Sequence, residues 1–402
     1  MPLIDDAKAM SDELSTLRRK LHAVPEVGLD LPVTQKILLD ELADLGLEVS
    51  TGKDLTSITA VLRGGKHTDN SPVVLLRADM DALPVVEQSG ESFAPAADSP
   101  HHQAMHACGH DMHMAGLIGA IRLLVQRRDE LPGDVVFMLQ PGEEGMDGAR
   151  YMIDEGVLDA AGRRVDAAYG LHVFSGYFEK GTIAARPGAL MAASAGLKVV
   201  VHGRGGHGSA PHMSADPVPA AAEMVTALQT AVTRQFNVFD PVVVTVGTFH
   251  AGTRRNIIPD DAEFEATIRA FSPEAMQKAG EVTTTVCKEI AAAHGLTADV
   301  TFTGEYPLTA NNADEFEFVA DTARDLLGDK RFLQMADPIT GSEDFSRVLD
   351  EVPGCYFFVG AGRDPLAKAG SNHSPIAAFD DSLLPDCSAL LAELAIRRLN
   401  RA

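Results

Sequence analysis

The sequence predicts an α/β protein in which helices cover both faces of a central mixed sheet, with a smaller α+β domain inserted into it. Three observations lead to this fold class. The chain has 402 residues, a length that suggests two or three domains rather than one. Apolar segments of strand length alternate with helical segments in the first half, which is typical of a sheet between helix layers. After about residue 188 the order of segments becomes β-α-β-β-α-β, as in a ferredoxin-like unit.

The first expected domain alternates helices and strands, and each element follows from its apolar pattern. Leu14, Leu17 and Leu21 form one stripe of a helix expected over residues 5–23. Short apolar runs between polar or glycine-containing segments predict buried strands. The further elements expected here are strands at 58–62, 73–76, 134–139 and 167–173, and helices at 112–125 and 149–158.

The inserted domain is expected to contain two helices and four strands. Asp216-Pro217 and Ser272-Pro273 each place a capping residue before a proline, which predicts the start of a helix. The pattern returns to α/β from residue 306. The strands expected in the insertion are 197–201, 242–249, 262–270 and 298–303, and the chain is expected to end in a helix at 384–399. The expected domains are 1–187 for the first part of the catalytic domain, 188–305 for the insertion and 306–402 for the second part.

Composition excludes several classes of function. Asp and Glu number 57 against 34 Lys and Arg, a formal charge of −23, and no basic patch interrupts this acidity. We therefore expect neither nucleic acid nor an anionic membrane as a partner. No apolar run reaches the roughly 20 residues that span a bilayer. The first residues lack the pattern of a secretory signal, so we expect a cytoplasmic protein. Four scattered cysteines are too few for a disulfide scaffold.

The motif ACGHD at 107–111 is the first candidate for chemistry. Cys108 and His110 lie two residues apart, so they do not share one face of a helix but can point the same way from an extended or looped segment. A thiolate with an imidazole is a typical pair of ligands for a borderline divalent metal. A buried, inert cysteine beside a hydrogen-bonded histidine explains this motif equally well.

Two further motifs place carboxylates where strands are expected to end. Glu143 and Glu144 follow an apolar strand in a loop bounded by glycines, and Asp79 and Asp81 follow an earlier apolar strand. Strand carboxyl ends build ligand sites in open α/β sheets. One of the two glutamates can bind a metal while the other acts as a base. An isolated pair of glutamates, however, more often lies in a solvent-exposed turn without such a role. Local pairing with Arg77 explains Asp79 better than it explains Asp81.

His172 and His373 complete the set of candidate ligands. His172 lies at the end of the strand expected at 167–173, and His373 lies in the second α/β segment. Each of them alone is more often a structural histidine. Together with Cys108, His110 and Glu144, they would suffice for two metal ions with positions open to water.

Nine motifs follow one another in a characteristic order along the chain. They are RRKLHAVPEVG at 18–28, RADMDALP at 77–84, ACGHD at 107–111, PGEEG at 141–145, GLHV at 170–173, GRGGHGSAPH at 203–212, RNIIPDDAEFEATIRAF at 255–271, GSEDFS at 341–346 and NHSP at 372–375. This series resembles the aminoacylase/carboxypeptidase superfamily of metal-dependent amidohydrolases. Within it, the chain is similar to the branch of hippurate hydrolases, N-acyl-amino-acid amidohydrolases and auxin-conjugate hydrolases.

The resemblance implies a metallohydrolase catalytic domain with an inserted lid, which forms a homodimer through the lid or a tetramer. It also implies a set of metal ligands. These are Cys108, His110, Glu144, His172 and His373. We expect two divalent ions per chain, with Mn(II) first and Zn(II), Co(II) or Ni(II) as alternatives, because a mixed donor set of this kind does not select sharply.

The resemblance implies further roles. Glu143 would be the general base, Asp81 would orient a ligand, and His207 of the lid would stabilise the oxyanion, within its own chain or across a dimer. Asn256 and Arg269 would contact the substrate carboxylate or the oxyanion. The expected reaction is hydrolysis of the amide bond of an N-acyl amino acid, which yields a carboxylic acid and a free amino acid.

Other functions remain open at this point. A dipeptidase or an N-acetyl-diaminopimelate-type deacetylase would use the same site and differ in the acyl pocket. A metal-dependent binding protein without turnover would have no need of a base beside a ligand carboxylate. A purely structural zinc site would show closed coordination and no hydrolysis.

Overall fold

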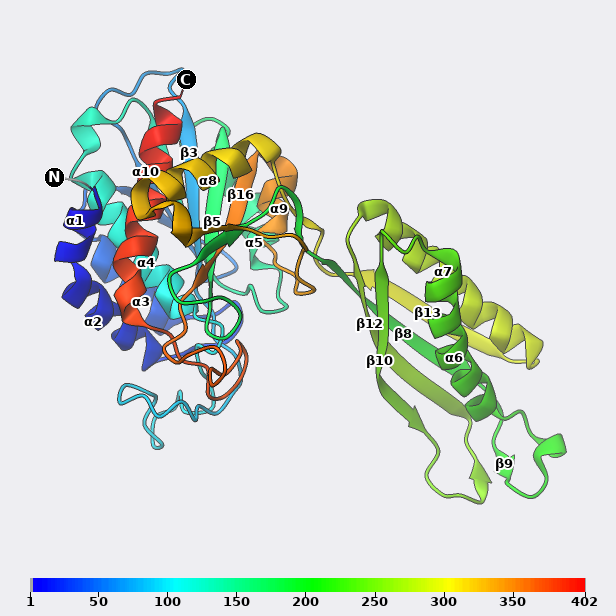
Figure 1. Ribbon diagram of the computed structural model, residues 1–402. Coiled ribbons are helices and arrows are strands. Elements are labelled where there is room, and N and C mark those ends of the chain that lie inside the picture. Colours follow the sequence, from blue (N-terminus) through cyan, green and yellow to red (C-terminus); the bar gives the residue numbers. More distant parts are fainter. Residues whose placement is uncertain (1–2, 402) are drawn as a thin grey trace. The chain divides into compact units, whose positions relative to one another are not determined.

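The computed structural model describes residues 3–401, which form two units drawn in Figure 1. Unit 1 runs to Leu190 and resumes in Ala310–Asp337 and from Asp344 onward, and unit 2 comprises Met191–Thr309 and Pro338–Glu343. The chain passes from one unit to the other after residues 190 and 309. The sequence analysis predicted these borders after residues 187 and 305. The short segment Pro338–Glu343 was not expected in the smaller unit.

The centre of unit 1 is a mixed sheet of eight strands within the described residues. Its order is β1-β2-β4-β3-β5-β16-β6-β15. The inner strands from β4 to β16 run parallel, whereas β2 and β6 run antiparallel to their inner neighbours. The strands are β1 (Glu48–Thr51), β2 (Ile58–Leu62), β3 (Val73–Asp79), β4 (Asp134–Gln140), β5 (Ala167–Phe174), β6 (Ile183–Ala185), β15 (Phe332–Gln334) and β16 (Gly354–Gly360).

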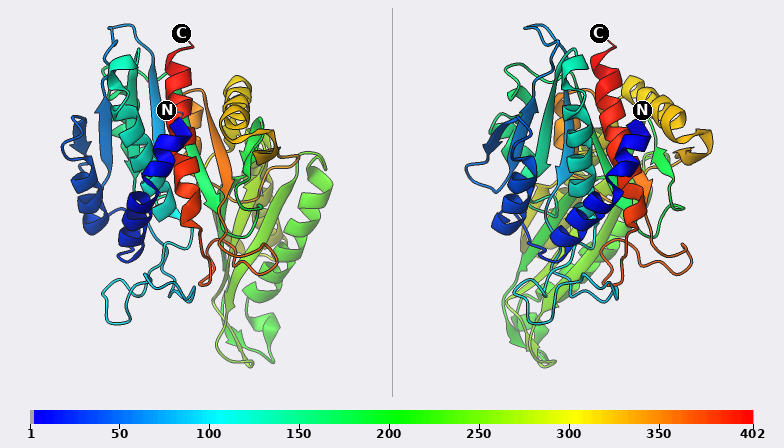
Figure 2. Two further views of the ribbon diagram at one scale, coloured as in Figure 1. Left: turned by 60° about the vertical axis from the view of Figure 1, so that its left-hand side comes forward. Right: turned by 90° about the vertical axis from the view of Figure 1, so that its left-hand side faces the viewer.

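Helices lie on both faces of this sheet, as the sequence predicted. They are α1 (Leu3–Ala9), α2 (Ser11–His22), α3 (Pro32–Leu42), α4 (His110–Val125), α5 (Gly148–Asp154), α8 (Ala313–Leu327), α9 (Ser346–Glu351) and α10 (Leu384–Leu399). In both views of Figure 2 the blue N-terminal helices lie beside the red α10. These helices and α4 share one core with Leu76, Phe137 and Phe357 of the sheet. At the other face, Gln140 and the start of α5 both bond to Asp344, just before α9.

The single helix expected over residues 5–23 is wrong. Met10, with φ −93° and ψ 4°, separates α1 from α2. Asp12 and Glu13 then fall in the first turn of a new helix, where the helix dipole favours acids. The break allows Leu3 and Leu14 each to be buried from a helix of its own direction.

Unit 2 is an antiparallel sheet in the order β10-β12-β8-β13, packed against two helices. Its main elements are β8 (Ala193–His202), α6 (Pro217–Gln235), β10 (Val242–Ala251), β12 (Asp261–Ala270), α7 (Pro273–Ala293) and β13 (Thr297–Gly304). This is the ferredoxin-like arrangement that the sequence predicted. Both predicted caps are present, because Asp216 accepts from Val218 N at 3.0 Å and Ser272 accepts from Ala275 N at 3.0 Å.

The remaining strands form two small pairs. One pair joins β9 (Gly206–His207) to β11 (Ile257–Ile258), and the other joins β7 (Gly188–Met191) to β14 (Thr309–Asn311). Among residues 3–401, no helix has the length and apolar character needed to cross a membrane. The parallel strands β3, β4 and β5 end at one edge of the main sheet, and the motifs that follow them are thereby brought together.

Candidate metal centre and active site

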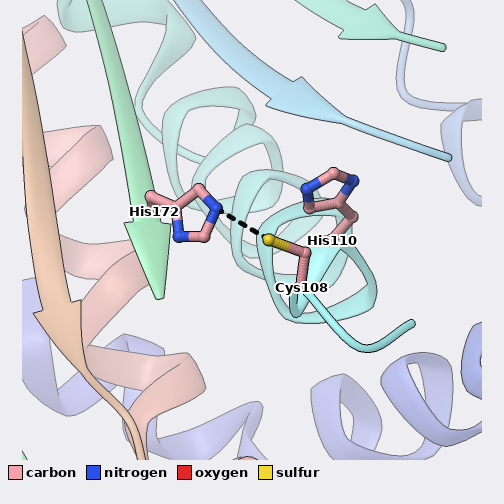
Figure 3. Close-up of side chains that lie close together, drawn as sticks. All are labelled: Cys108, His110 and His172. Carbon is pink, nitrogen blue, oxygen red and sulfur yellow. Dashed lines mark hydrogen bonds between the residues drawn. The ribbon is translucent and has the colours of Figure 1, made fainter. Parts of the chain in front are cut away.

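The start of α4 presents the first two predicted ligands at this edge of the sheet. Gly109 adopts a φ of +85°, and a Cβ atom there would lie 2.4 Å from a side-chain atom of Val173, so only glycine fits the turn. The turn leaves Cys108 just outside the helix that His110 begins. Both side chains lie close to His172 at the end of β5 (Figure 3), and the donor atoms of the three residues lie within 4.8 Å of one another.

Main-chain hydrogen bonds fix which ring nitrogen of each histidine faces this cluster. Nδ1 of His110 lies 2.8 Å from the carbonyl oxygen of Asp81, and Nδ1 of His172 lies 2.8 Å from that of Val173. A carbonyl only accepts, so in the neutral ring Nδ1 carries the hydrogen and Nε2 keeps its lone pair. Nε2 of His172 lies 3.2 Å from Cys108 Sγ. The buried Nε2 of His110 has no hydrogen-bond partner within residues 3–401, as suits a metal ligand.

A second donor group shares Cys108 with the first. Nε2 of His373 lies 3.2 Å from Cys108 Sγ and 3.2 Å from Glu144 Oε1. The donor atoms of these three residues also lie within 4.8 Å of one another. The structure therefore brings together all five side chains that the sequence nominated as ligands, in two groups with one thiol in common.

The loop that carries His373 has a strained backbone. His373 has a φ of +68°, which residues other than glycine rarely adopt. Its amide donates to the carbonyl of Ala107 at 3.0 Å. The amide side chain of Asn372 donates to the carbonyl of Val173 at 2.9 Å and to that of Cys108 at 3.2 Å. These bonds tie the loop to the two other ligand-bearing segments, and strain held in this way is common at functional sites.

Asp81 organises the turn that carries the two glutamates. Its carboxylate oxygens accept from the backbone amides of Glu143 at 2.9 Å and Glu144 at 3.0 Å. The side chain of Glu143 is buried, and its Oε2 lies 4.0 Å from Nε2 of His110. The side chain of Asp81 thus positions the candidate base Glu143 and the candidate ligand Glu144. Its carbonyl oxygen positions a second candidate ligand, His110.

A buried polar network beside the donor atoms was missed from the sequence. Arg77 forms ion pairs with Asp79 at 2.5 Å and with Asp344 at 3.1 Å. His113 places Nδ1 2.5 Å from Asp79 Oδ1, and its Nε2 accepts from the amide of Val173 at 2.8 Å. Because these bonds engage both ring nitrogens, His113 is not available to a metal, although its donor atoms lie close to those of the ligand candidates. The predicted pairing of Asp79 with Arg77 is confirmed.

The pKa values of the cluster show how its charges balance. Hydrogen bonds with Cys108 and Glu144 raise the pKa of His373 to about 10. Burial acts to raise the pKa of Glu144, but the hydrogen bond with His373 lowers it overall. Burial, together with the charge of His113, lowers the pKa of His172. A proton on His373 therefore offsets the anionic groups, and a divalent cation can replace that proton because metal binding releases protons from ligands. The donor set fits a metal of borderline softness.

In unit 2 the structure brings His207 and Asn256 together. His207 of β9 pairs with Ile257 of β11, and the amide of Gly208 donates to the carbonyl of Asn256 at 2.9 Å. The amide of Ser209 donates to Nδ1 of His207 at 3.1 Å, and the Ser209 hydroxyl lies 2.8 Å from the same atom. Because an amide only donates, a neutral His207 carries its hydrogen on Nε2. The exposed ring therefore offers an N–H donor.

Arg269 lies on β12 of the four-stranded sheet, at the end of that strand away from the pair of β9 and β11. It pairs with Ser194 at the start of β8, whereas Asp261 pairs with His202 at the end of β8 that leads to β9. The distance along β12 from Asp261 to Arg269 is about 26 Å at the usual rise of a strand. Within unit 2, the structure does not bring Arg269 together with His207.

The two units and the donor cluster are those of a metal-dependent amidohydrolase. The chain belongs to peptidase family M20/M25/M40, whose model matches residues 75–397. It is 37% identical to thermostable carboxypeptidase 2 of Saccharolobus solfataricus, over 99% of this chain and 98% of that protein. It is 36% identical to an N-acetylcysteine deacetylase of Bacillus subtilis, over 97% of each chain. A solved Bacillus subtilis structure, described as a dinuclear metal-binding peptidase of the M20 family, matches with a TM-score of 0.83 at 33% identity and covers 98% of this chain and 99% of its own.

Proposed function

We propose that the protein hydrolyses the amide bond of N-acyl amino acids to a carboxylic acid and a free amino acid. The observation that carries this proposal is the sharing of Cys108 by two donor groups, with Glu143 4.0 Å from His110. A closed structural site has no use for a further carboxylate of this kind. The name of the N-acetylcysteine deacetylase relative supports N-acyl amino acids as the substrate class.

Two divalent ions are proposed for the two donor groups. Cys108 would serve both, with His110 and His172 on one side and Glu144 and His373 on the other. The lone pair of His110, which has no hydrogen-bond partner in the described chain, supports this assignment. Mn(II) is proposed first on the family resemblance, and Zn(II), Co(II) and Ni(II) suit the same ligands. When bound, the ions polarise the amide carbonyl and lower the pKa of a water molecule.

The side chains around the ligands supply proton transfer and orientation. Glu143 takes a proton from the attacking water and passes it to the leaving nitrogen. Asp81 keeps Glu143 in place through its backbone amide. His207 donates its Nε2 hydrogen to the carbonyl oxygen as negative charge develops there. Asn256 and Arg269 bind the carboxylate of the amino acid, for which the fork of an arginine is well suited.

Unit 2 is proposed to act as a lid that works within a homodimer. His207 lies on β9, which follows the end of β8 that pairs with Asp261, and Arg269 lies about 26 Å from Asp261 along β12. This separation is larger than a small N-acyl amino acid. Both can contact one substrate only if one of them comes from a second copy, so we propose that His207 acts across subunits. A tetramer is the alternative assembly. Cytoplasmic residence is proposed from the composition alone.

The experiment that tests this function separates the base from a ligand. Glu143→Gln should retain the metals and lose roughly 10²- to 10⁴-fold in turnover, because a general base contributes about that much. Glu144→Gln and Cys108→Ala should instead lose metal. Metal per chain is measured by elemental analysis, and kcat is measured on a panel of N-acyl amino acids. Full activity in both glutamate variants would contradict the mechanism.

A dipeptidase or carboxypeptidase is the second candidate function, favoured by the name of the Saccharolobus solfataricus relative. It would use the same ligands and base, as would an N-acetyl-diaminopimelate-type deacetylase. Dipeptides and N-acetyl-diaminopimelate in the same panel separate these candidates by their kcat/KM. Tight binding of any of these compounds without turnover would favour a binding protein instead.

A further inference from the structure

The loop that carries the candidate base Glu143 closes on itself. It comprises residues 140–149, and we call it the base loop. The amide of Gly148 donates to the carbonyl of Gly142 at 3.1 Å. A Cβ atom at Gly148 would lie 1.8 Å from the carbonyl oxygen of Pro141, so only glycine permits this approach. The two ends of the base loop therefore meet, and Glu143 lies between them in the chain.

Asp344, just before α9, bonds to both ends of the base loop. Its carboxylate is fully buried and accepts from Nε2 of Gln140 at 2.7 Å and from the amide of Ala149 at 2.9 Å. Ala149 is the second residue of α5, and an amide at that position is usually bonded by the side chain of the residue just before the helix. Here that residue is Asp147, and in the described structure its side chain does not cap α5. Asp344 therefore supplies the cap from a distant part of the chain.

Arg347 binds Asp147 instead. Nε of Arg347 donates to Oδ1 of Asp147 at 3.1 Å and Nη2 donates to Oδ2 at 3.0 Å, which makes a two-pronged ion pair. Asp147 has a φ of +57°, a left-handed conformation that is strained in residues other than glycine and persists only where neighbours hold it. The amide of Arg347 donates to the carbonyl of Asp344 at 2.9 Å. One turn of chain therefore holds the base loop at Gln140, Asp147 and Ala149.

We propose that Asp344 and Arg347 are positioning residues for the general base Glu143, an inference that rests on the proposed hydrolysis of N-acyl amino acids. Asp81 bonds to the middle of the base loop, and those bonds alone do not fix its ends. The bonds from Asp344 and Arg347 supply the missing fixed points, so that the carboxylate of Glu143 stays beside His110. Because a displacement of about 1 Å can cost on the order of 100-fold in rate, these residues act on turnover rather than on substrate binding.

The test removes the ion pair of Arg347, whose side chain is 29% exposed and can be replaced without opening the core. With saturating Mn(II) and the full-length enzyme, Arg347→Met should lower kcat on an N-acyl amino acid roughly 10- to 100-fold and leave KM nearly unchanged. Metal content is measured on the same samples and should stay at the wild-type value. Arg347→Lys keeps the charge but not the fork, so it should lose less.

A matched control removes an ion pair of nearly the same exposure. Arg331 and Asp386 of α10 are 34% and 15% exposed, against 29% and 14% for Arg347 and Asp147. Arg331→Met should keep the wild-type kcat. A fall in kcat of the same size in this control would show that any lost ion pair slows the enzyme, and it would overturn the specific role of Arg347.

A measurement without substrate keeps this inference separate from the proposed function. Hydrogen exchange of the metal-loaded protein, followed by mass spectrometry, should be faster over residues 140–149 in Arg347→Met than in the wild type and unchanged there in Arg331→Met. If no N-acyl amino acid is hydrolysed but this exchange depends on Arg347, the anchoring of the base loop stands and the proposed function fails. If the wild type is active and Arg347→Met keeps its kcat, or loses kcat only together with metal, Arg347 does not position the base.

Discussion

His110, His172 and His207 each have one ring nitrogen fixed by a main-chain group that can only donate or only accept. At His110 and His172 a carbonyl oxygen takes the hydrogen of Nδ1. At His207 the amide of Ser209 occupies Nδ1, which leaves the hydrogen on Nε2. A metal ligand needs a lone pair and an oxyanion donor needs a hydrogen. The backbone therefore sets the tautomer that each proposed role requires, a free lone pair on Nε2 of His110 and His172 and a hydrogen on Nε2 of His207.

The role of His207 can be tested with its neighbour as the control. His207→Ala should lower kcat roughly 10²- to 10³-fold, the usual loss for one oxyanion donor, while metal content stays at the wild-type value. Ser209→Ala removes the hydroxyl but keeps the amide that fixes the tautomer, so its kcat should fall much less. Steady-state kinetics and metal analysis on both variants check this. A wild-type kcat in His207→Ala would exclude the residue from the mechanism.

The turn at Gly109, directly before α4, shows what the backbone must provide for this site. Gly109 needs both a positive φ and an absent side chain, because Val173 lies 2.4 Å from the position of a Cβ atom. Gly156 has a φ of +90° as well, but nothing lies within 4 Å of its Cβ position. A substitution at Gly156 therefore measures the cost of backbone strain alone, whereas one at Gly109 adds the cost of a steric clash.

We expect Gly156→Ala to cost about 1 kcal/mol, as a left-handed alanine does. Gly109→Ala should cost clearly more, because Val173 must also move, and it should weaken metal binding by shifting Cys108 against His110. Thermal unfolding with and without a chelator measures both effects. Equal shifts in the two variants, with equal metal content, would show that the close contact at Gly109 does not matter.

The sequence predicted the parts of the site that follow from local pattern. Apolar strands that end in polar residues placed the glutamates and His172 at one edge of the sheet, and the pairing of Asp79 with Arg77 is likewise local. The partner that Arg77 has in Asp344 lies 267 residues away, and no periodicity connects them. The place of His113 in this network could not be predicted for a related reason. Its two hydrogen bonds go to Asp79 of β3 and to the backbone of β5, which are distant from it in sequence. The break at Met10 depends on how α1 and α2 pack, which their apolar stripe does not encode.

A buried ionic network joins distant parts of unit 1. His22 of α2 is 2% exposed, with Nδ1 2.7 Å from Asp111 of α4 and Nε2 3.0 Å from Glu87. Arg18 lies 2.6 Å from Asp111 and 3.1 Å from Asp381, close to the start of α10. Burial acts to lower the pKa of His22, but the two carboxylates raise it to about 9. The network therefore holds the ligand-bearing end of α4 against α2.

The stability of the whole molecule should depend on the charge of His22. Its pKa is raised on folding, so its contribution is fully present below its unfolded value, near 6.5, and is lost as the pH rises to about 9. The shift corresponds to on the order of 3 kcal/mol. Chemical unfolding of the metal-loaded protein at several pH values measures this loss. In His22→Gln the loss over this range should be smaller, and the two stability curves should converge at high pH. A difference that does not change with pH would contradict the prediction.

The position of unit 2 within the chain also sets the order in which the ligand candidates leave the ribosome. Cys108, His110, Glu144 and His172 emerge first, and His373 follows about 200 residues later, a delay of roughly 10–40 s at the usual 5–20 residues per second. During this interval the first donor group is complete and the second is not. The loop at Asn372, which ties the three ligand-bearing segments together, is absent as well. If the proposed ligands are correct, loading of both metal ions should therefore be a late event in synthesis, because a nascent chain carries four of the five ligand candidates before the fifth has been made.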